Sequence, residues 1–247
     1  MKKILFAATF ALFASTQAFA IIGAGVHYVM NTGSLKANSG TIEDFGLKVN
    51  QEKSDGLQGL GFKLWLDILP FVDIEGTFNI TAARYRTSLE YPDLGLDPVY
   101  LEYTPKPPYS MIFPKASPIF GVATGDISIT YPFDIAPIIR PYLGAGLSYI
   151  VSTPVVNKAF VEKVMESYPQ NGVAPPTTEE LSESVMRTLK NSDYKIGMGG
   201  HIIAGIRIKP PIIPFAIYGN GKYYIGGNTN SQFSQGFVLE AGGGFAL

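Results

Sequence analysis

Residues 59–68 read GLGFKLWLDI and alternate strictly between large apolar side chains and small or polar ones. The even-numbered positions hold leucine, phenylalanine or isoleucine, whereas the odd-numbered positions hold glycine, Lys63, Trp65 and Asp67. Successive side chains of a β-strand point to opposite faces, so an alternation with a period of two is typical of a strand. This stretch therefore predicts a strand with one apolar face and one face that carries the polar groups.

The same alternation recurs along the chain and predicts eight strands in all. The other seven segments are 22–30, 72–81, 124–133, 140–151, 195–208, 215–225 and 237–247. Short connections such as 69–71 and 210–214 alternate with long ones that begin near Asn31, Tyr91 and Ser152. Short turns at one end and long loops at the other are typical of outer-membrane barrels. The fold class predicted is all-β: a closed, antiparallel transmembrane β-barrel of about eight strands. A further hairpin within 91–118 would make ten.

The direction of the apolar face separates two kinds of barrel. A soluble lipocalin-like periplasmic binder has its apolar side chains inside, whereas a membrane barrel has them outside. Here the polar face is rich in glycine and poor in charge, although a water-exposed surface would need about a quarter to a third of charged residues. Aromatic residues near strand ends of the apolar face are typical of an interfacial girdle. These are Tyr28, Tyr131, Phe133, Tyr149, Phe215, Phe237 and Phe245. We therefore expect the apolar face to contact lipid, with the soluble binder as the alternative.

The composition narrows the classes of function. The chain of 247 residues has no cysteine, two histidines, 16% charged residues and a formal net charge of −1. These features exclude a disulfide scaffold, a thiolate metal site and a cysteine nucleophile, and they leave no basic footprint for nucleic acid. Both His27 and His201 fall on the polar face, and neither has the serine two residues away that a barrel lipid hydrolase would suggest. We therefore predict a non-enzymatic protein without catalytic, cofactor-binding or metal-binding residues.

Residues 1–20 have the three parts of a secretory signal peptide. Lys2 and Lys3 form a positive start, residues 4–14 an apolar run, and Ala18-Phe19-Ala20 a small-residue cleavage site. The run is too short to span a bilayer, and no later segment offers about 18 uninterrupted apolar residues. The expected organisation is a signal peptide at 1–20 and an outer-membrane β-barrel domain at 21–247, located in the cell outer membrane.

The polar face carries charges of both signs, and in a barrel of eight strands these side chains fill the lumen. Because buried charges need partners, we expect them to pair across the interior. One interpretation is a polar plug that makes the barrel rigid, and the other is a selective narrow path for solutes. The predicted lumen-facing network consists of Lys63, Asp67, Asp73, Glu75, Asp126, Arg140, Lys195, His201, Arg207, Lys222 and Glu240.

The long loop after residue 151 has helical periodicity in two pieces. Thr177 and Glu180 have the spacing of a capping box before the second piece. The two apolar stripes predict a helical hairpin that folds over the barrel mouth, with a partner-binding surface or a hydrophobic gate as alternatives. The possible gate residues are Phe160, Val164, Met165, Leu181, Val185 and Leu189.

Residues 140–149, RPYLGAGLSY, resemble the Pro-Tyr-x-Gly-Ala-Gly-x-x-Tyr strand of the outer-membrane protein W family, where a long loop also follows. The resemblance implies a small Gram-negative barrel that passes small, often hydrophobic solutes or acts structurally at the cell surface. A sealed barrel for adhesion or partner binding is the alternative. It also implies contact with outer-membrane lipid and lipopolysaccharide, and with the barrel-assembly machinery through the C-terminal strand. That family usually ends in phenylalanine, whereas here Leu247 follows Phe245 and Ala246.

Overall fold

A computed structural model describes residues 22–67, 71–95, 97–102, 117–133, 138–167, 176–210 and 213–246. Eight long strands form one closed antiparallel barrel, because β1 pairs with both β13 and β4. The remaining neighbours pair in chain order, as predicted. The strands are β1 (Ile22–Leu35), β4 (Ser54–Leu66), β5 (Asp73–Arg84), β8 (Ile119–Pro132), β9 (Ile139–Ser152), β10 (Lys195–Ile208), β11 (Phe215–Gly226) and β13 (Phe237–Ala246). The predicted signal peptide at 1–20 and the terminal Leu247 lie outside the described residues.

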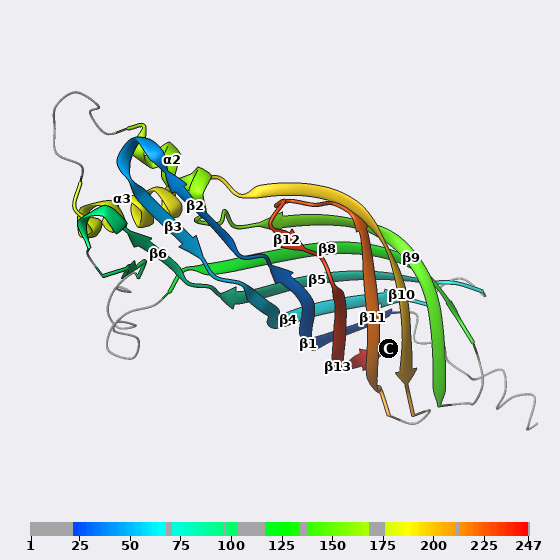
Figure 1. The fold of residues 1–247 in the computed structure, drawn as a ribbon. Coiled ribbons are helices and arrows are strands. Elements are labelled where there is room, and N and C mark those ends of the chain that lie inside the picture. The colour runs from blue at the N-terminus through cyan, green and yellow to red at the C-terminus, as the bar shows by residue number, and fades with distance from the viewer. Residues whose placement is uncertain are drawn as a thin grey trace, which may run out of the picture.

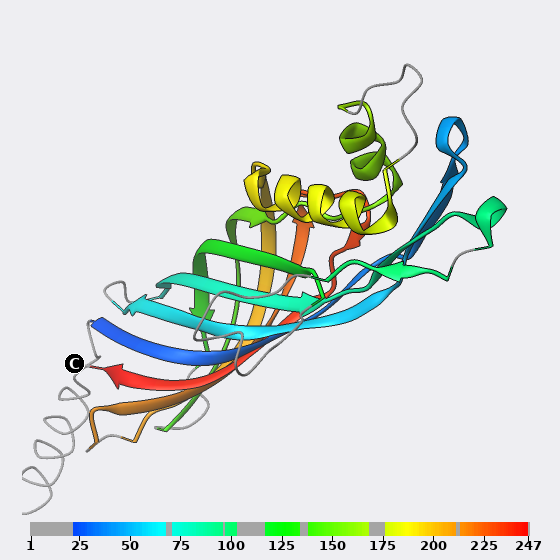
Figure 2. The ribbon, with the colours of Figure 1, turned by 90° about the vertical axis from the view of Figure 1, so that its left-hand side faces the viewer.

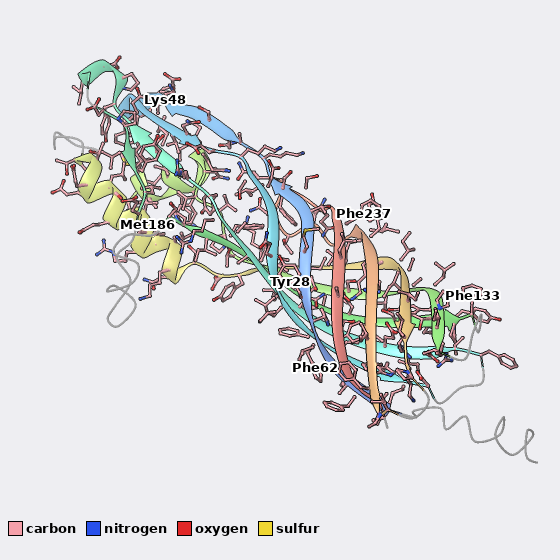
Figure 3. All side chains as sticks on the ribbon, turned by 90° about the horizontal axis from the view of Figure 1, so that it is seen from below. Tyr28, Lys48, Phe62, Phe133, Met186 and Phe237 are labelled. Carbon is pink, nitrogen blue, oxygen red and sulfur yellow. The ribbon has the colours of Figure 1, made fainter. Side chains whose placement is uncertain are left out.

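The apolar face of the barrel points outward. Leu60 is 72% exposed on this face, whereas Trp65 on the opposite face of the same strand is 1% exposed. All seven aromatic residues of the predicted girdle are exposed, and Tyr28, Phe133 and Phe237 project from the outer wall (Figure 3). A lipocalin-like barrel would have the reverse arrangement, so that alternative is wrong. The outer surface is that of a barrel that crosses a lipid bilayer. None of the helices in the described part of the chain is long and apolar enough to do so.

The long connections contain more regular structure than the sequence predicts. Strands β1 and β4 extend past the barrel, and a second sheet of order β2-β3-β6-β7 lies beyond them. These strands are β2 (Asn38–Ile42), β3 (Leu47–Gln51), β6 (Thr87–Glu90) and β7 (Val99–Tyr100), and β12 (Phe233–Ser234) pairs with the end of β1. Two 3-10 turns, Glu43–Phe45 and Pro92–Leu94, lie in the same connections. Strands β2, β3, β6 and β7 belong to the second sheet, and β12 pairs only with Ser34 and Leu35 at the end of β1. Eight strands, and not ten, therefore close the described barrel; residues 103–116 lie outside the description.

Two helices, α2 (Lys158–Met165) and α3 (Thr178–Asn191), form the loop after β9. The side chain of Asn157 caps α2 by accepting the Phe160 N–H. The capping box predicted for α3 is confirmed, because Thr177 and Glu180 each accept the other's backbone N–H. Figures 1 and 2 show both helices and the second sheet at the end of the barrel opposite the C-terminus. We call β2, β3, β6, β7, α2 and α3 the outer cap, and the end of the barrel with the short connections the turn end. In an outer-membrane barrel the turn end faces the periplasm.

Candidate functional site

A polar network fills the lower and middle interior of the barrel, and all eight strands contribute to it. Because the strand period places every second side chain inside, polar residues at alternate positions of each strand converge on the barrel axis. The members with the highest burial, at most 9% exposed, are His27, Lys63, Asp67, Asp73, Glu75, Asn79, Asp126, Ser128, Tyr142, Ser148, His201, Arg207, Tyr218, Asn220, Lys222, Tyr224 and Glu240.

Arg207 joins three strands near the turn end. Its Nη1 donates to Asp67 Oδ1 at 3.1 Å and to Asp73 Oδ2 at 3.4 Å, and its Nη2 donates to Glu75 Oε1 at 2.7 Å. The guanidinium also lies 5.0 Å from the ring of Trp65, a cation–π contact. Half-buried Arg140 reaches Asp67 Oδ2 at 3.4 Å from the neighbouring strand. The cation is therefore held by Asp67, which directly follows β4, and by two carboxylates on β5, so the ends of these strands are fixed to β10.

Two lysines continue the network toward the middle of the barrel. Lys63 Nζ donates to Glu75 Oε2 and Asn220 Oδ1, both at 2.9 Å. Lys222 Nζ lies 2.8 Å from Asp126 Oδ2 and 2.8 Å from Glu240 Oε1. Each ammonium thus has at least one carboxylate partner, as a cation in a low-dielectric interior requires.

Glu240 is the acceptor at the centre of the network. Besides Lys222, its two oxygens accept the side-chain amides of Asn79 and Asn220, each at 2.7 Å. Asn79 Oδ1 in turn accepts from His27 Nε2 at 2.7 Å. His27 Nδ1 is then the acceptor of the Tyr218 hydroxyl at 3.1 Å. One carboxylate therefore connects side chains from β1, β5, β11 and β13.

His201 lies between two serine hydroxyls. Ser128 Oγ is 2.8 Å from its Nε2, and Ser148 Oγ is 2.8 Å from its Nδ1. A serine beside an imidazole is the pair used in nucleophilic catalysis, but the base there is oriented by a third group and the nucleophile faces a substrate. Here both ring nitrogens are taken by serines, and all three side chains are at most 2% exposed. The arrangement is that of a packed interior.

The structure brings most of the predicted lumen residues together. Lys195 is the exception, and its prediction as a member of the network was wrong: it is exposed at the first residue of β10, although its register partner Ser152 on β9 is buried. Several uncharged members of the network are absent from the prediction, namely His27, Asn79, Ser128, Tyr142, Ser148, Tyr218, Asn220 and Tyr224. Their positions on the polar face of predicted strands were the signal that could have found them.

Above the polar network, an apolar cluster closes the outer mouth of the barrel. It combines inward-facing residues of the barrel wall, such as Val29, Phe120 and Ile150, with the apolar stripes of α2 and α3. Among the predicted gate residues, Val164, Met165, Leu181 and Val185 are fully buried in this cluster, and Phe160 and Leu189 pack against its edge. The helices thus bury their own stripes over the mouth.

Tyr85 connects the barrel to the outer cap. It follows the last residue of β5, is buried, and its hydroxyl accepts the Val156 N–H at 3.0 Å just before α2. Burial raises the pKa of Tyr85 to about 12, from an ordinary value of 10.0, because the phenolate would lose its hydration.

This pKa predicts an alkaline weakening of the outer cap. Between pH 10 and about 12 an unfolded cap releases the Tyr85 proton while the folded cap retains it, so its free energy of unfolding falls as the pH rises. Below pH 10 both states hold the proton and this dependence vanishes. We expect the protection factors of α2 amides, which correct for the base catalysis of exchange itself, to fall across that range in the native chain. In Tyr85→Phe the free energy of unfolding of the cap should fall less steeply with pH. An equal pH dependence in both proteins would show that other groups cause the effect.

No group of three or more histidine or acidic side chains among the described residues is arranged to hold a metal ion. The polar interior instead consists of carboxylates that already have lysine or arginine partners.

Comparisons with known proteins support the architecture. No protein-family model and no curated protein matches the sequence. Among solved structures, the outer membrane protein OprG from Pseudomonas aeruginosa aligns with a TM-score of 0.51 and 9% identity, covering 92% of this chain and 95% of that one. Ail of Yersinia pestis, in complex with the heparin analogue sucrose octasulfate, aligns at 0.44 with 11% identity, covering 92% and 97% of the two chains. The outer membrane protease OmpT from Escherichia coli aligns at 0.40 with 11% identity, covering 94% and 99%.

At these identities the likeness to OprG shows the fold, and the other two alignments are too weak to add to it. The protein has the fold and the lipid-facing surface of an outer-membrane β-barrel. The finer assignment to the outer-membrane protein W family stays a prediction.

Proposed function

We propose that this protein is a non-enzymatic outer-membrane barrel with a sealed interior, whose function is structural and lies in the outer cap that it holds at the cell surface. The observation that carries this proposal is the buried network from Arg207 to Glu240, which joins all eight strands through the space that a pore would need. The apolar cluster at the outer mouth is a second barrier above it. An ion that entered from either side would have to break charge pairs or cross apolar side chains.

The interior chemistry also favours a structural role over catalysis. The Ser128–His201–Ser148 group has the residue types of a hydrolase but lies at the buried centre of the barrel. Passage of small hydrophobic solutes, which the family resemblance implies, would require the cluster around Leu181 and Val185 to open.

The sealed interior is tested by reconstituting the full protein in planar lipid bilayers and recording single-channel currents. The salt concentration is about 1 M, at which charges on the protein surface are screened within roughly 3 Å. We expect no stepwise conductance, and no swelling of protein-containing liposomes in small sugars. A steady, reproducible conductance would overturn the proposal and favour the narrow solute path. Folding of each sample is checked by the different gel mobility of unboiled and boiled protein.

A further inference from the structure

The second sheet of the outer cap has two edge strands, β7 and β2, and they differ in how they are protected against further pairing. An edge strand presents backbone N–H and C=O groups to any other strand, and proteins block such edges with short strands, proline and charge. The β7 edge has all three devices. It is two residues long, Pro98 directly precedes it, and exposed Asp97 lies before that proline. This edge is therefore unsuited to pairing with another strand.

The β2 edge has none of these devices. Its five residues, Asn38–Ile42, include no proline and no charge, and no strand of the described chain pairs with the side that faces away from β3. This edge begins above Lys36, whose N–H donates to Gln232 O at 2.8 Å. Lys158, at the start of α2, lies against Gly40 from the inner face of the sheet, where the register partner of Gly40 is also buried. An unprotected edge of this length can accept one more strand.

The charges at the two ends of β2 are complementary to each other. Exposed Lys36 precedes the strand, and exposed Asp44 follows it. If the five residues of one copy pair antiparallel with the same five residues of a second copy, Gly40 meets Gly40 and Ser39 meets Thr41. Lys36 of each copy then lies opposite Asp44 of the other, so both ends of the pair join unlike charges. This match favours a second copy of the chain as the strand that the edge accepts.

The direction of β2 decides how two such copies lie. Figures 1 and 2 show β2 and β3 continuing outward from the barrel, away from the turn end. The same edge of two copies meets through a two-fold axis, and this symmetry makes the paired strands antiparallel. Antiparallel β2 strands place the two barrels at opposite ends of the joined sheet. The two copies therefore belong to two membranes that face each other, and not to one membrane.

We propose that the β2 edge binds the β2 edge of a second copy on a facing outer membrane, so that two four-stranded sheets become one and two cells are joined. The inference deepens the proposed function by naming the partner of the outer cap, and it rests on the placement of that cap at the cell surface. It does not rest on the sealed interior, so a conducting barrel would refute the seal and leave the pairing unchanged. Each pair of strands is short, and attachment depends on many copies acting together.

The pairing is tested with cells of a Gram-negative host that display the full protein and have short lipopolysaccharide chains. Two populations with different fluorescent labels are mixed, and two-coloured clumps are counted. Native cells should clump with one another and not with cells that lack the protein. Lys36→Glu and Asp44→Lys should each reduce clumping among their own cells about tenfold or more, because each replaces two unlike pairs by like charges and many pairs act together. A mixture of the two variants should clump as native cells do, because unlike charges again lie opposite each other.

The matched controls are Lys190→Glu and Asp193→Lys. They make the same charge changes at exposed positions at the end of α3, beside the outer ends of β8 and β9, and β9 lies across the barrel from β1. Both controls should clump as native cells do, and the gel mobility shift shows that each variant is folded. Dispersed native cells would overturn the proposal, and so would a mixture of the two test variants that stays dispersed. Clumping of native cells with cells that lack the protein would identify a different partner and also overturn it.

The register of the pair is tested by cross-linking. The chain has no cysteine, so Ser39→Cys and Thr41→Cys each introduce a single thiol. Opposite residues of antiparallel strands have Cα atoms about 4.5–5.5 Å apart, within the range of a disulfide. Mild oxidation of mixed cells that carry one variant each should give disulfide-linked dimers. Either variant alone brings its thiols only to diagonal positions about 7–8 Å apart and should give few. Equal yields from the mixture and from the single variants would contradict the pairing.

Discussion

Replacement of Glu240 by alanine is expected to lower the free energy of unfolding by about 3–5 kcal/mol, because it removes one member of a buried charge network and leaves its partners unmatched. Glu240 is 2% exposed and accepts from Lys222, Asn79 and Asn220 at 2.7–2.8 Å. In the variant, both amides lose their acceptor and the Lys222 ammonium retains only Asp126. No replacement partner is available on the strand itself, since the inward neighbours of Glu240 are Val238 and Gly242.

The chain supplies its own probe for this measurement. Trp65 is the single tryptophan, lies inside the barrel at 1% exposure, and contacts Arg207 and Tyr218. Its fluorescence in urea titrations of the protein in lipid vesicles reports opening of the barrel itself. Glu90→Ala is the matched control, because Glu90 pairs with Lys48 at 3.5 Å and both side chains are partly exposed, where such a pair contributes about 0–1 kcal/mol. Equal destabilisation by the two variants would show that the interior network does not hold the barrel together.

Replacement of Val185 by aspartate is expected to release the outer cap while the barrel persists. Val185 is fully buried between α3 and the apolar cluster, and an unpaired carboxylate there would lose its hydration without gaining a partner. We expect rapid cleavage of α2 and α3 by trypsin at Lys163 and Lys190, in contrast to the protected native cap. The barrel should still show its heat-dependent gel mobility, because its strands pair independently of the helices.

Arg187→Asp places the same side chain two residues away on the exposed side of α3 and should leave the cap protected. If Val185→Asp also abolished the mobility shift, the cap would be part of the barrel's folding unit. If Val185→Asp left the trypsin resistance unchanged, the folding of α2 and α3 would not depend on their contact with the apolar cluster.

The sequence predicted the barrel and its inside-out polarity because both follow from local alternation. Residues such as Leu60 and Trp65 reveal their faces by spacing alone. Spacing does not reveal where the interior ends, which is why Lys195 was assigned to the lumen. Nor does it reveal which polar residues meet, since Asn79 and Glu240 are joined only by the closure of the barrel. The second sheet was missed for another reason: Leu47 and Val49 alternate over just five residues of β3, a segment short enough to read as loop.

The network also bears on the order of folding. Lys63–Asn220 and Asn79–Glu240 join residues 157 and 161 positions apart, so these bonds form only once the N-terminal and C-terminal strands have come together. Interactions that are absent from the transition state slow unfolding without accelerating folding. The bonds of Glu240 therefore slow the unfolding of the completed barrel. They add little to the rate of insertion and much to the lifetime of the inserted protein.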